Sequence, residues 1–300
     1  MKKKLNRRGL YPFLLAMPFV IFLLIFSYLP LAGWACAFFD YKPGLKFSEM
    51  EFVGLKYILY MFQTWSQTKE VLINTLVLSF LGILTSPLPV IFAIMLTEVK
   101  ATKFKKFIQT TTTLPNFISW IIVSGLAFSL LSADGMVNTV LKNLGIIDTG
   151  INFLGDPNKS WPLMIILSVW KTLGWNAIIY LAAIAGIDQE LYDAAAVDGA
   201  NRWQRIWHVT VPGISSTYFV LLLLSISNLL SNGMDQYFAF TNAAVSQKLT
   251  VLDLYVYQIG VLGRQYSYSI AIGMWKTIIG IVLLMSVNKL SKKVRGVGLV

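Results

Sequence analysis

The chain has 300 residues, of which 56% are hydrophobic and only 13% are charged. A soluble domain has about 25% charged residues, so this chain carries roughly half the charge that a solvated surface requires. The composition therefore indicates an integral membrane protein. The net charge of +11 is accordingly attributed to contact with a membrane surface in preference to binding of a nucleic acid. The single cysteine, Cys36, excludes a disulfide within the chain, and the single histidine, His208, argues against a histidine-rich metal site.

Uncharged segments locate the membrane spans, and the longest of them cover 9–39, 71–97, 107–133 and 209–234. Two further apolar segments each contain one lysine, Lys171 or Lys276. A spanning helix needs about 20 apolar residues. We therefore predict an all-α polytopic membrane protein, a single domain over 1–300, with six spans near 11–33, 72–97, 115–132, 162–186, 212–232 and 268–289. Pro87 and Pro89 are expected to kink the second span.

The first predicted span follows a basic segment that includes Lys2, Lys3 and Lys4, which is also typical of a signal peptide. The apolar run is longer than the roughly 7–15 residues of a signal-peptide core. The segment that ends at Cys36, Gly-Trp-Ala-Cys, lacks the leucine expected in a lipoprotein cleavage site. These features favour an uncleaved anchor.

The distribution of basic residues predicts the orientation. With the N-terminus inside, the inside segments contain 15 lysines and arginines and the outside segments contain 8. The acids are distributed in the opposite sense, five inside and nine outside. Because positive residues concentrate in cytoplasmic loops, where they meet anionic headgroups, we predict that both termini are cytoplasmic.

The predicted cytoplasmic loop 188–212 has the pattern of two short helices joined by a turn. Asp188 is a candidate N-cap, and Gly199 can end the first helix in a left-handed conformation. Trp203 and Trp207 lie at helical spacing in the second helix, and Pro212 is expected to open the fifth span. Such a hairpin can lie on lipid or insert into a groove of a partner protein. Four acids within 188–198 favour the partner, because anionic headgroups repel them.

Residues 193–212 resemble the EAA loop of ABC-importer permeases, in which Glu-Ala-Ala-x-x-Asp-Gly-Ala is followed at a fixed distance by Leu-Pro. The chain departs from this pattern with Asp193 for Glu, Ile206 for Phe and Val211 for Leu. It matches the pattern at Ala194, Ala195, Asp198, Gly199, Ala200, Val209 and Pro212. Over nearly its whole length the chain is similar to the carbohydrate-uptake branch of this family, the LplB-type and MalF-like permeases. Segments that carry this similarity include 28–30, 114–120, 151–154 and 180–188.

The resemblance implies a transport complex in the bacterial cytoplasmic membrane that works by alternating access. Its other members would be a second homologous permease, a cytoplasmic ABC ATPase dimer that binds ATP and Mg, and an extracytoplasmic sugar-binding lipoprotein that delivers an oligosaccharide. The coupling contact with the ATPase would be formed by Asp193, Ala194, Ala195, Asp198, Gly199 and Ala200. The chain itself has no Gly-x-x-x-x-Gly-Lys-Ser/Thr phosphate loop. We therefore expect it to be no enzyme and to hold no cofactor of its own.

Lys171 and Lys276 are unfavourable for membrane insertion, because a lysine in the middle of a span raises the insertion free energy by about 2.5–3.5 kcal/mol. Each could bind backbone carbonyls at a helix break, pair with an acid of a partner chain, or line a polar path. The predicted spans contain no acid, which suggests the hypothesis that the lysines meet an acidic substrate such as a uronate-containing oligosaccharide. Indole rings can stack on sugar rings, and amides can bind sugar hydroxyls, although span asparagines also serve helix packing. The candidate path residues are Lys171, Lys276, Trp170, Trp175, Asn176, Asn228 and Trp275.

Three other functions are less consistent with the sequence. An ion-coupled secondary transporter of a polar solute is the main alternative, but such proteins usually place acids within spans. A membrane-embedded enzyme would need several His, Asp or Ser groups at membrane depth. Nucleic-acid binding is not expected, because the basic residues are spread over separate segments beside the spans.

Overall fold

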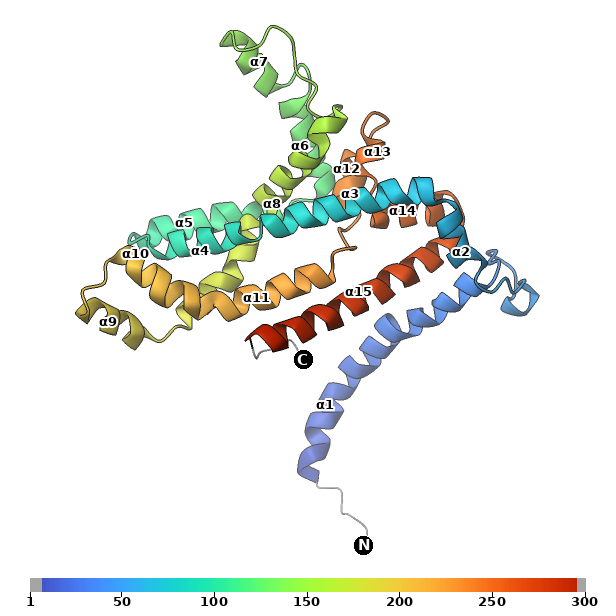
Figure 1. The fold of residues 1–300 in the computed structure, drawn as a ribbon, viewed down its shortest axis with the longest axis horizontal. Coiled ribbons are helices and arrows are strands. Elements are labelled where there is room, and N and C mark those ends of the chain that lie inside the picture. Colours follow the sequence, from blue (N-terminus) through green and yellow to red (C-terminus); the bar gives the residue numbers. More distant parts are fainter. Residues whose placement is uncertain (1–6, 296–300) are drawn as a thin grey trace. The chain divides into compact units, whose positions relative to one another are not determined.

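The computed structural model describes residues 7–295 as helices joined by short loops, which confirms the all-α prediction (Figure 1). Lys2, Lys3 and Lys4 lie outside the described residues. Within the described part, strand-like pairing is limited to one isolated bridge between Phe39 and Phe52. The chain divides into two compact units, Met1–Trp65 with Val256–Thr277, and Ser66–Tyr255 with Ile278–Val300. The single domain expected from the sequence stays a prediction, and the two units are described separately.

Six helices are long and apolar enough to span a membrane, as the sequence predicts. They are Pro12–Phe38, Thr68–Thr97, Trp120–Asn143, Pro157–Ala185, Arg202–Ser227 and Tyr266–Lys293. The first, second, fourth and sixth agree with the predicted spans to within about five residues at each end. The third and fifth differ more, and each difference has a local cause.

The second span is interrupted where the sequence predicts a kink. Helix α3 covers Trp65–Leu84 and α4 covers Pro87–Thr97, with a turn between them. Pro87 begins α4, where its missing N–H is not needed for a helical hydrogen bond.

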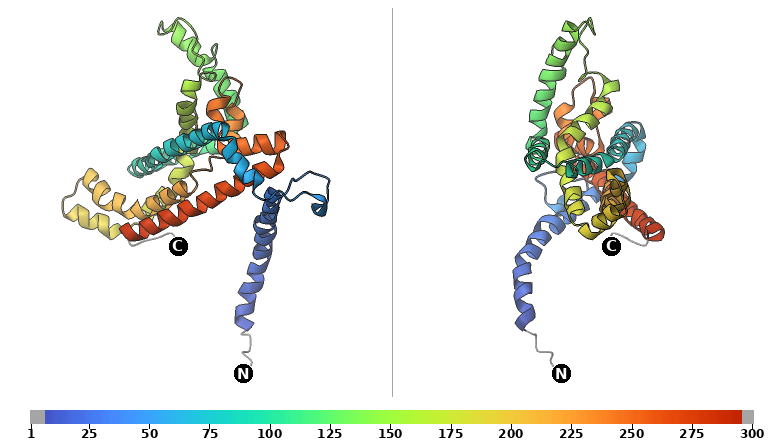
Figure 2. Two further views of the ribbon diagram at one scale, coloured as in Figure 1. Left: turned by 45° about the vertical axis from the view of Figure 1, so that its right-hand side comes forward. Right: turned by 90° about the vertical axis from the view of Figure 1, so that its left-hand side faces the viewer.

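The third predicted span, near 115–132, begins later in the structure, at Trp120, because a break in the chain precedes it. Helix α5 (Thr102–Thr113) runs into a 3-10 turn (Leu114–Phe117), and the chain is then extended at Ile118 and Ser119, with ψ of 135° and 152°. Helix α6 (Trp120–Leu131) starts afresh, because the Ser119 side chain accepts a hydrogen bond from the Ile122 N–H. Figure 2 shows α6 leading away from α5 toward α7 (Met136–Asn143).

The fifth span begins ten residues before the predicted position. Helix α10 (Arg202–Arg205), a π-helical turn (Ile206–Thr210) and α11 (Val211–Ser227) form one continuous helical segment. Pro212 lies in the first turn of α11, as predicted, but α11 is preceded by helical residues, so the span itself begins earlier, at Arg202. The segment ends at Ser227 rather than near residue 232, and Asn228 is its C-cap.

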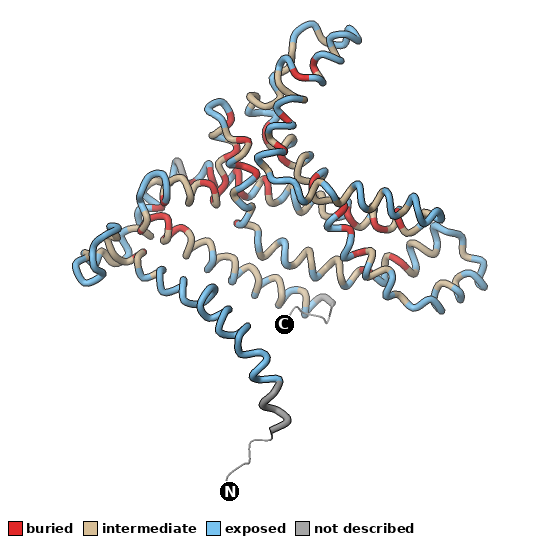
Figure 3. Tube along the Cα trace, turned by 180° about the vertical axis from the view of Figure 1, so that it is seen from behind, coloured by how far each residue is buried: buried red, intermediate tan, exposed pale blue. Residues whose placement is uncertain are grey.

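In the first unit, the first span consists of α1 (Arg7–Leu23), a π-helical turn (Leu24–Tyr28) and a 3-10 helix (Leu29–Phe38). No residue of its most apolar stretch is buried within the chain, and Figure 3 shows this helix as exposed. The unit also contains a 3-10 turn (Phe47–Glu49), α2 (Lys56–Gln63), a π-helical turn (Gln258–Leu262) and the first part of α15 (Tyr266–Arg295). Ser267 ties α15 to the end of the first span, since its hydroxyl donates to the Phe39 carbonyl at 2.7 Å and accepts from the Tyr41 N–H at 2.9 Å.

In the second unit, α8 (Pro157–Ala185) is the helix against which α4, α5 and α11 pack. The contact between α8 and α5 depends on Gly174, because a Cβ at this position would lie 2.4 Å from the Thr112 carbonyl carbon. The short helices α12 (Asp235–Phe240), α13 (Ser246–Leu249) and α14 (Leu252–Tyr257) follow α11. The Trp161 indole N–H donates to the Lys248 carbonyl at 2.9 Å and so joins this region to the start of α8.

Replacing Gly174 with alanine is expected to destabilise the second unit. Alanine normally favours a helix by about 0.5–1 kcal/mol over glycine. Here the methyl group would meet the backbone of α5, and such overpacking costs about 1–3 kcal/mol. Gly125→Ala is the matched control, because a Cβ at Gly125 in α6 meets nothing within 4 Å. Thermal unfolding in detergent should show a lower Tm for Gly174→Ala and an unchanged or higher Tm for Gly125→Ala. Equal effects would contradict the close contact.

Candidate functional site

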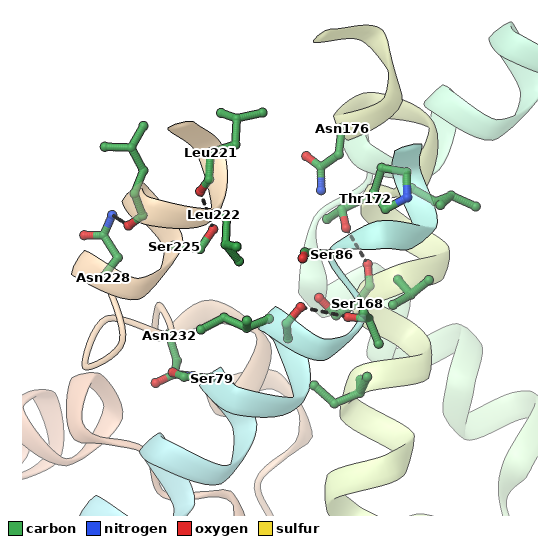
Figure 4. Close-up of a pocket in the computed structure, with 18 of the residues that line it drawn as sticks. Ser79, Ser86, Ser168, Thr172, Asn176, Leu221, Leu222, Ser225, Asn228 and Asn232 are labelled. Carbon is green, nitrogen blue, oxygen red and sulfur yellow. Dashed lines mark hydrogen bonds between the residues drawn. The ribbon is translucent and has the colours of Figure 1, made fainter. Parts of the chain in front are cut away.

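The second unit contains a cavity of about 510 Å³ among α3, α4, α8 and α11 (Figure 4). A volume in the range of about 300–1,000 Å³ is typical of sites for small molecules and cofactors. One wall is the stretch of α3 and α4 from Leu78 to Pro89, and a second is the face of α8 from Ile165 to Tyr180. The third wall comes from α11 and the residues after it, and Gln236 and Tyr237 of α12 also belong to the lining.

The cavity lining is polar but uncharged. None of the described residues that line it is an aspartate, glutamate, lysine or arginine. Its hydrogen-bonding groups are hydroxyls and amides, from Ser79, Thr85, Ser86, Ser168, Thr172, Asn176, Tyr180, Tyr218, Ser225, Asn228, Ser231, Asn232, Gln236 and Tyr237. Burial raises the pKa of Tyr237 to about 12, so this phenol is also neutral at ordinary pH.

Hydrogen bonds between segments far apart in the sequence fix several of these groups. The Asn232 amide donates to the Ser79 hydroxyl at 2.9 Å, and Ser79 in turn donates to the Leu229 carbonyl at 2.5 Å. The Ser86 and Tyr218 hydroxyls lie 3.1 Å apart. The Asn232 Oδ1 atom is buried without a hydrogen-bond partner in the chain. A buried acceptor of this kind is costly unless another donor reaches it, which makes it a candidate contact for a bound hydroxyl.

The structure brings together only part of the predicted path. Asn176 and Asn228 line the cavity (Figure 4). Trp170 and Trp175 lie on α8 but outside the lining, and both are roughly half exposed. The Trp175 ring instead packs edge-on against Phe117, with ring centroids 5.6 Å apart. Trp275 and Lys276 belong to the first unit and are not among the lining residues.

Sequence reasoning missed the serines and threonines of the cavity, although a signal for them exists. Ser168, Thr172 and Asn176 recur every four residues and therefore lie on one face of α8. In the same way, Ser79 and Ser86 are two turns apart on the opposite wall. Small polar side chains repeated at helical spacing through an apolar span would have indicated this face more reliably than tryptophan and lysine.

Lys171 occupies a different site, the break between α5 and α6. It lies in the middle of α8, is only 6% exposed, and is not among the cavity-lining residues. Its ammonium group donates to the Pro115 carbonyl at 3.2 Å and to the Asn116 carbonyl at 2.7 Å. The Trp120 ring lies beside it, with Nζ 5.4 Å from the ring centroid. Of the interpretations open from the sequence, these contacts favour the one in which the lysine binds backbone carbonyls at a helix break.

The predicted coupling loop has the expected helix–turn–helix form. Helix α9 (Gln189–Val197) starts at Asp188, whose carboxylate accepts from the Glu190 N–H at 3.0 Å. Gly199 has φ of +76°, the left-handed conformation in which a side chain would be strained. A reciprocal pair of hydrogen bonds between Asn201 and Gln204 then caps α10. The predicted contact residues Asp193, Ala194, Ala195, Asp198, Gly199 and Ala200 are all exposed or partly exposed.

Comparison with known proteins identifies the protein family to which the chain belongs. Residues 85–296 match the family of binding-protein-dependent transport system inner membrane components. The chain belongs to this family. It is a transport permease, the membrane component of a transport system, and not itself an enzyme.

Relatives of the permease are similar to it in sequence over most of its length. It is 40% identical over 291 residues to the protein LplB of Bacillus subtilis (strain 168), which covers 96% of this chain and 90% of the relative. It is 41% identical to the polygalacturonan/rhamnogalacturonan transport system permease protein YteP of the same organism, over 94% and 88% of the two chains. A crystal structure of a bacterial alginate ABC transporter in complex with an alginate pentasaccharide-bound periplasmic protein contains a chain that matches with a TM-score of 0.86. That chain is 32% identical, and 98% of each chain is covered. These findings confirm the predicted family and place the permease in the inner membrane.

Replacing Lys171 with methionine is expected to lower transport of acidic and neutral solutes to similar extents. Methionine keeps the length of the side chain but leaves the Pro115 and Asn116 carbonyls without their donor, at a cost of about 1–3 kcal/mol for each buried group. Uptake of an acidic oligosaccharide and of its neutral methyl ester should be measured in vesicles that contain the whole transport complex. Trp170→Leu, one residue away and outside both sites, is the control. A selective loss of the acidic substrate would contradict the structural role.

Proposed function

We propose that this permease forms one half of the path by which an ATP-driven importer carries an oligosaccharide across the membrane. The observation that carries the proposal is an uncharged cavity with many hydroxyl and amide groups, lined largely by spanning helices of a binding-protein-dependent permease. A second, homologous permease would supply the facing half. A cytoplasmic ABC ATPase dimer would drive the cycle, and an extracytoplasmic sugar-binding lipoprotein would deliver the substrate.

The cavity chemistry suits a sugar. Carbohydrates present many hydroxyls, which both donate and accept hydrogen bonds, and the side-chain hydroxyls and amides of the cavity can do the same. The apolar faces of sugar rings can pack on aromatic rings, which Tyr180, Tyr218 and Tyr237 supply in the lining. Leu221 and Leu222 add apolar surface between the polar positions. Many weak, similar contacts suit transport, because a path must release its solute as well as bind it.

The substrate we infer is a uronate-containing oligosaccharide that is recognised in this chain through its hydroxyls. The names of YteP and of the alginate transporter refer to polymers of acidic sugars, which supports this class. The lining of the cavity contains no cation among the described residues, so it offers no ion pair to a carboxylate. The carboxylates would then remain hydrated or meet the second permease.

The loop between the fourth and fifth spans is the proposed contact with the ATPase. Helix α9 exposes Leu191 and Val197, of which Val197 is 88% exposed, beside four acidic residues. A short amphipathic helix with exposed apolar residues fits a groove on a partner protein. In this arrangement the loop faces the cytoplasm, and both termini do so as well.

Replacing Asn176 with leucine is expected to weaken transport more than replacing its neighbour Trp175. Asn176 lines the cavity and Trp175 does not, so the two variants differ in their position relative to the proposed path. Loss of one uncharged hydrogen bond of about 0.5–1.5 kcal/mol corresponds to roughly a two- to twelvefold increase in KM. The KM of each variant is measured by ATP-dependent uptake in vesicles with the complete importer. A larger effect of Trp175→Leu than of Asn176→Leu would contradict the proposed path, and uptake without ATP would contradict the proposed class.

Replacing Ala194 with glutamate should uncouple the importer without unfolding the permease. Ala194 is exposed on α9, so the change has little effect within the chain, but it adds a charge at the proposed contact with the ATPase. Uptake should fall about tenfold or more, the factor given by 1.4 kcal/mol of lost docking free energy. Ala243→Glu, also exposed but in the loop after α12, is the matched control. Equal ATP-dependent uptake by the two variants would exclude Ala194 from the contact.

A further inference from the structure

A second hollow, of about 350 Å³, lies at the base of the loop that carries α9. Lys100, Arg202 and Arg205 line it together with a single carboxylate, that of Glu98. Tyr192 and Thr210 add hydroxyl groups to its wall. The lining therefore combines an excess of positive charge with hydrogen-bond donors, which is the chemistry that binds an anion.

The ends of two spans indicate where this hollow lies relative to the bilayer. The second span ends at Thr97, directly before Glu98, and the fifth begins at Arg202. Residues at these positions lie where the hydrocarbon of a bilayer gives way to the headgroups. Trp203 and Trp207 are 72% and 63% exposed and belong to the same helical segment as the two arginines. Tryptophan is enriched at this level of a membrane, so the surroundings of the hollow also fit the headgroup region.

Contacts inside the hollow join α9 to the fifth span. The Tyr192 and Thr210 hydroxyls lie 2.9 Å apart, and Thr210 is buried. Arg202 Nε lies 3.6 Å from the Glu98 carboxylate, which partly balances one of the three cations. Lys100 and Arg205 have no second carboxylate among the described lining residues. An anion bound beside them would connect the end of α4 to the start of α10 and so fix the base of the loop.

We propose that this hollow binds the phosphate group of an anionic lipid headgroup, such as that of phosphatidylglycerol. Arginine binds phosphate oxygens through paired N–H groups, lysine adds a compact charge, and basic pockets between spanning helices recognise lipid headgroups. The acidic helix α9 and the basic segment α10 then have separate partners, α9 a protein and α10 the membrane surface. This inference requires that the chain lies in a membrane, and it does not depend on the transported solute or on ATP coupling.

The test is lipid retention by the purified full-length chain, measured by native mass spectrometry after exchange into mixed micelles of phosphatidylglycerol and phosphatidylcholine. The wild-type chain should retain phosphatidylglycerol in preference to phosphatidylcholine. A lysine or arginine that contacts an anionic headgroup contributes about fivefold to binding, so the double variant Lys100→Gln with Arg205→Gln should reduce the preference about 25-fold. Lys103→Gln with Lys106→Gln removes the same charge from exposed positions of α5 outside the lining and should leave the preference nearly unchanged.

Three outcomes would overturn the proposal. Equal losses in the two double variants would mean that general surface charge, rather than the hollow, attracts the lipid. If millimolar inorganic phosphate displaced the lipid completely, the site would belong to a soluble phosphate compound. If retention were unchanged in Lys100→Gln with Arg205→Gln while binding of the ATPase was lost, the hollow would receive a carboxylate of that subunit. Thermal unfolding of both double variants shows that the comparison is made between folded chains.

Discussion

The structure depends on one constraint, that backbone carbonyls inside a bilayer must have hydrogen-bond donors. Unsatisfied groups cost several kcal/mol in hydrocarbon, so a helix can be interrupted at membrane depth only where other groups replace the lost bonds. The break between α5 and α6 meets this condition because Lys171, in the middle of α8, donates to the carbonyls of Pro115 and Asn116. Gly174, one turn further on, lets the end of α5 approach α8 closely enough for this contact.

This use of Lys171 determines the character of the cavity. A lysine that binds two carbonyls and lies beside the Trp120 ring is not among the residues that line the cavity. The lining that remains is made of hydroxyls, amides and tyrosine rings. Such a surface can bind different positions along a sugar chain with similar strength, whereas a buried cation would hold an acidic solute at one point. The helix break and the uncharged cavity are therefore two consequences of where α8 places its polar residues.

The sequence predicted the parts of the molecule that follow local rules. Apolar length identified six spans, Pro87 identified the interruption of the second, and Asp188 and Gly199 identified the ends of α9. Non-local contacts decided the rest. The α5–α6 break is not visible in the hydrophobic run over 115–132, because what stabilises it is a lysine about 55 residues away. For the same reason Asn176 and Asn228 were predicted with Trp170 and Trp175, although only the asparagines face the cavity.

The most direct test of this account is the reactivity of single cysteines along α8. The chain has one natural cysteine, so Cys36→Ser provides the background. Asn176→Cys places a thiol in the cavity, and Ile166→Cys places one on an exposed face of the same helix outside the lining. The two variants are treated with a membrane-impermeant maleimide in vesicles with the complete importer, with and without ATP. The reagent should label Asn176→Cys, and substrate should slow that labelling. Ile166→Cys should stay unlabelled. Labelling of Ile166→Cys with Asn176→Cys inert in both conditions would show that the solute path runs elsewhere.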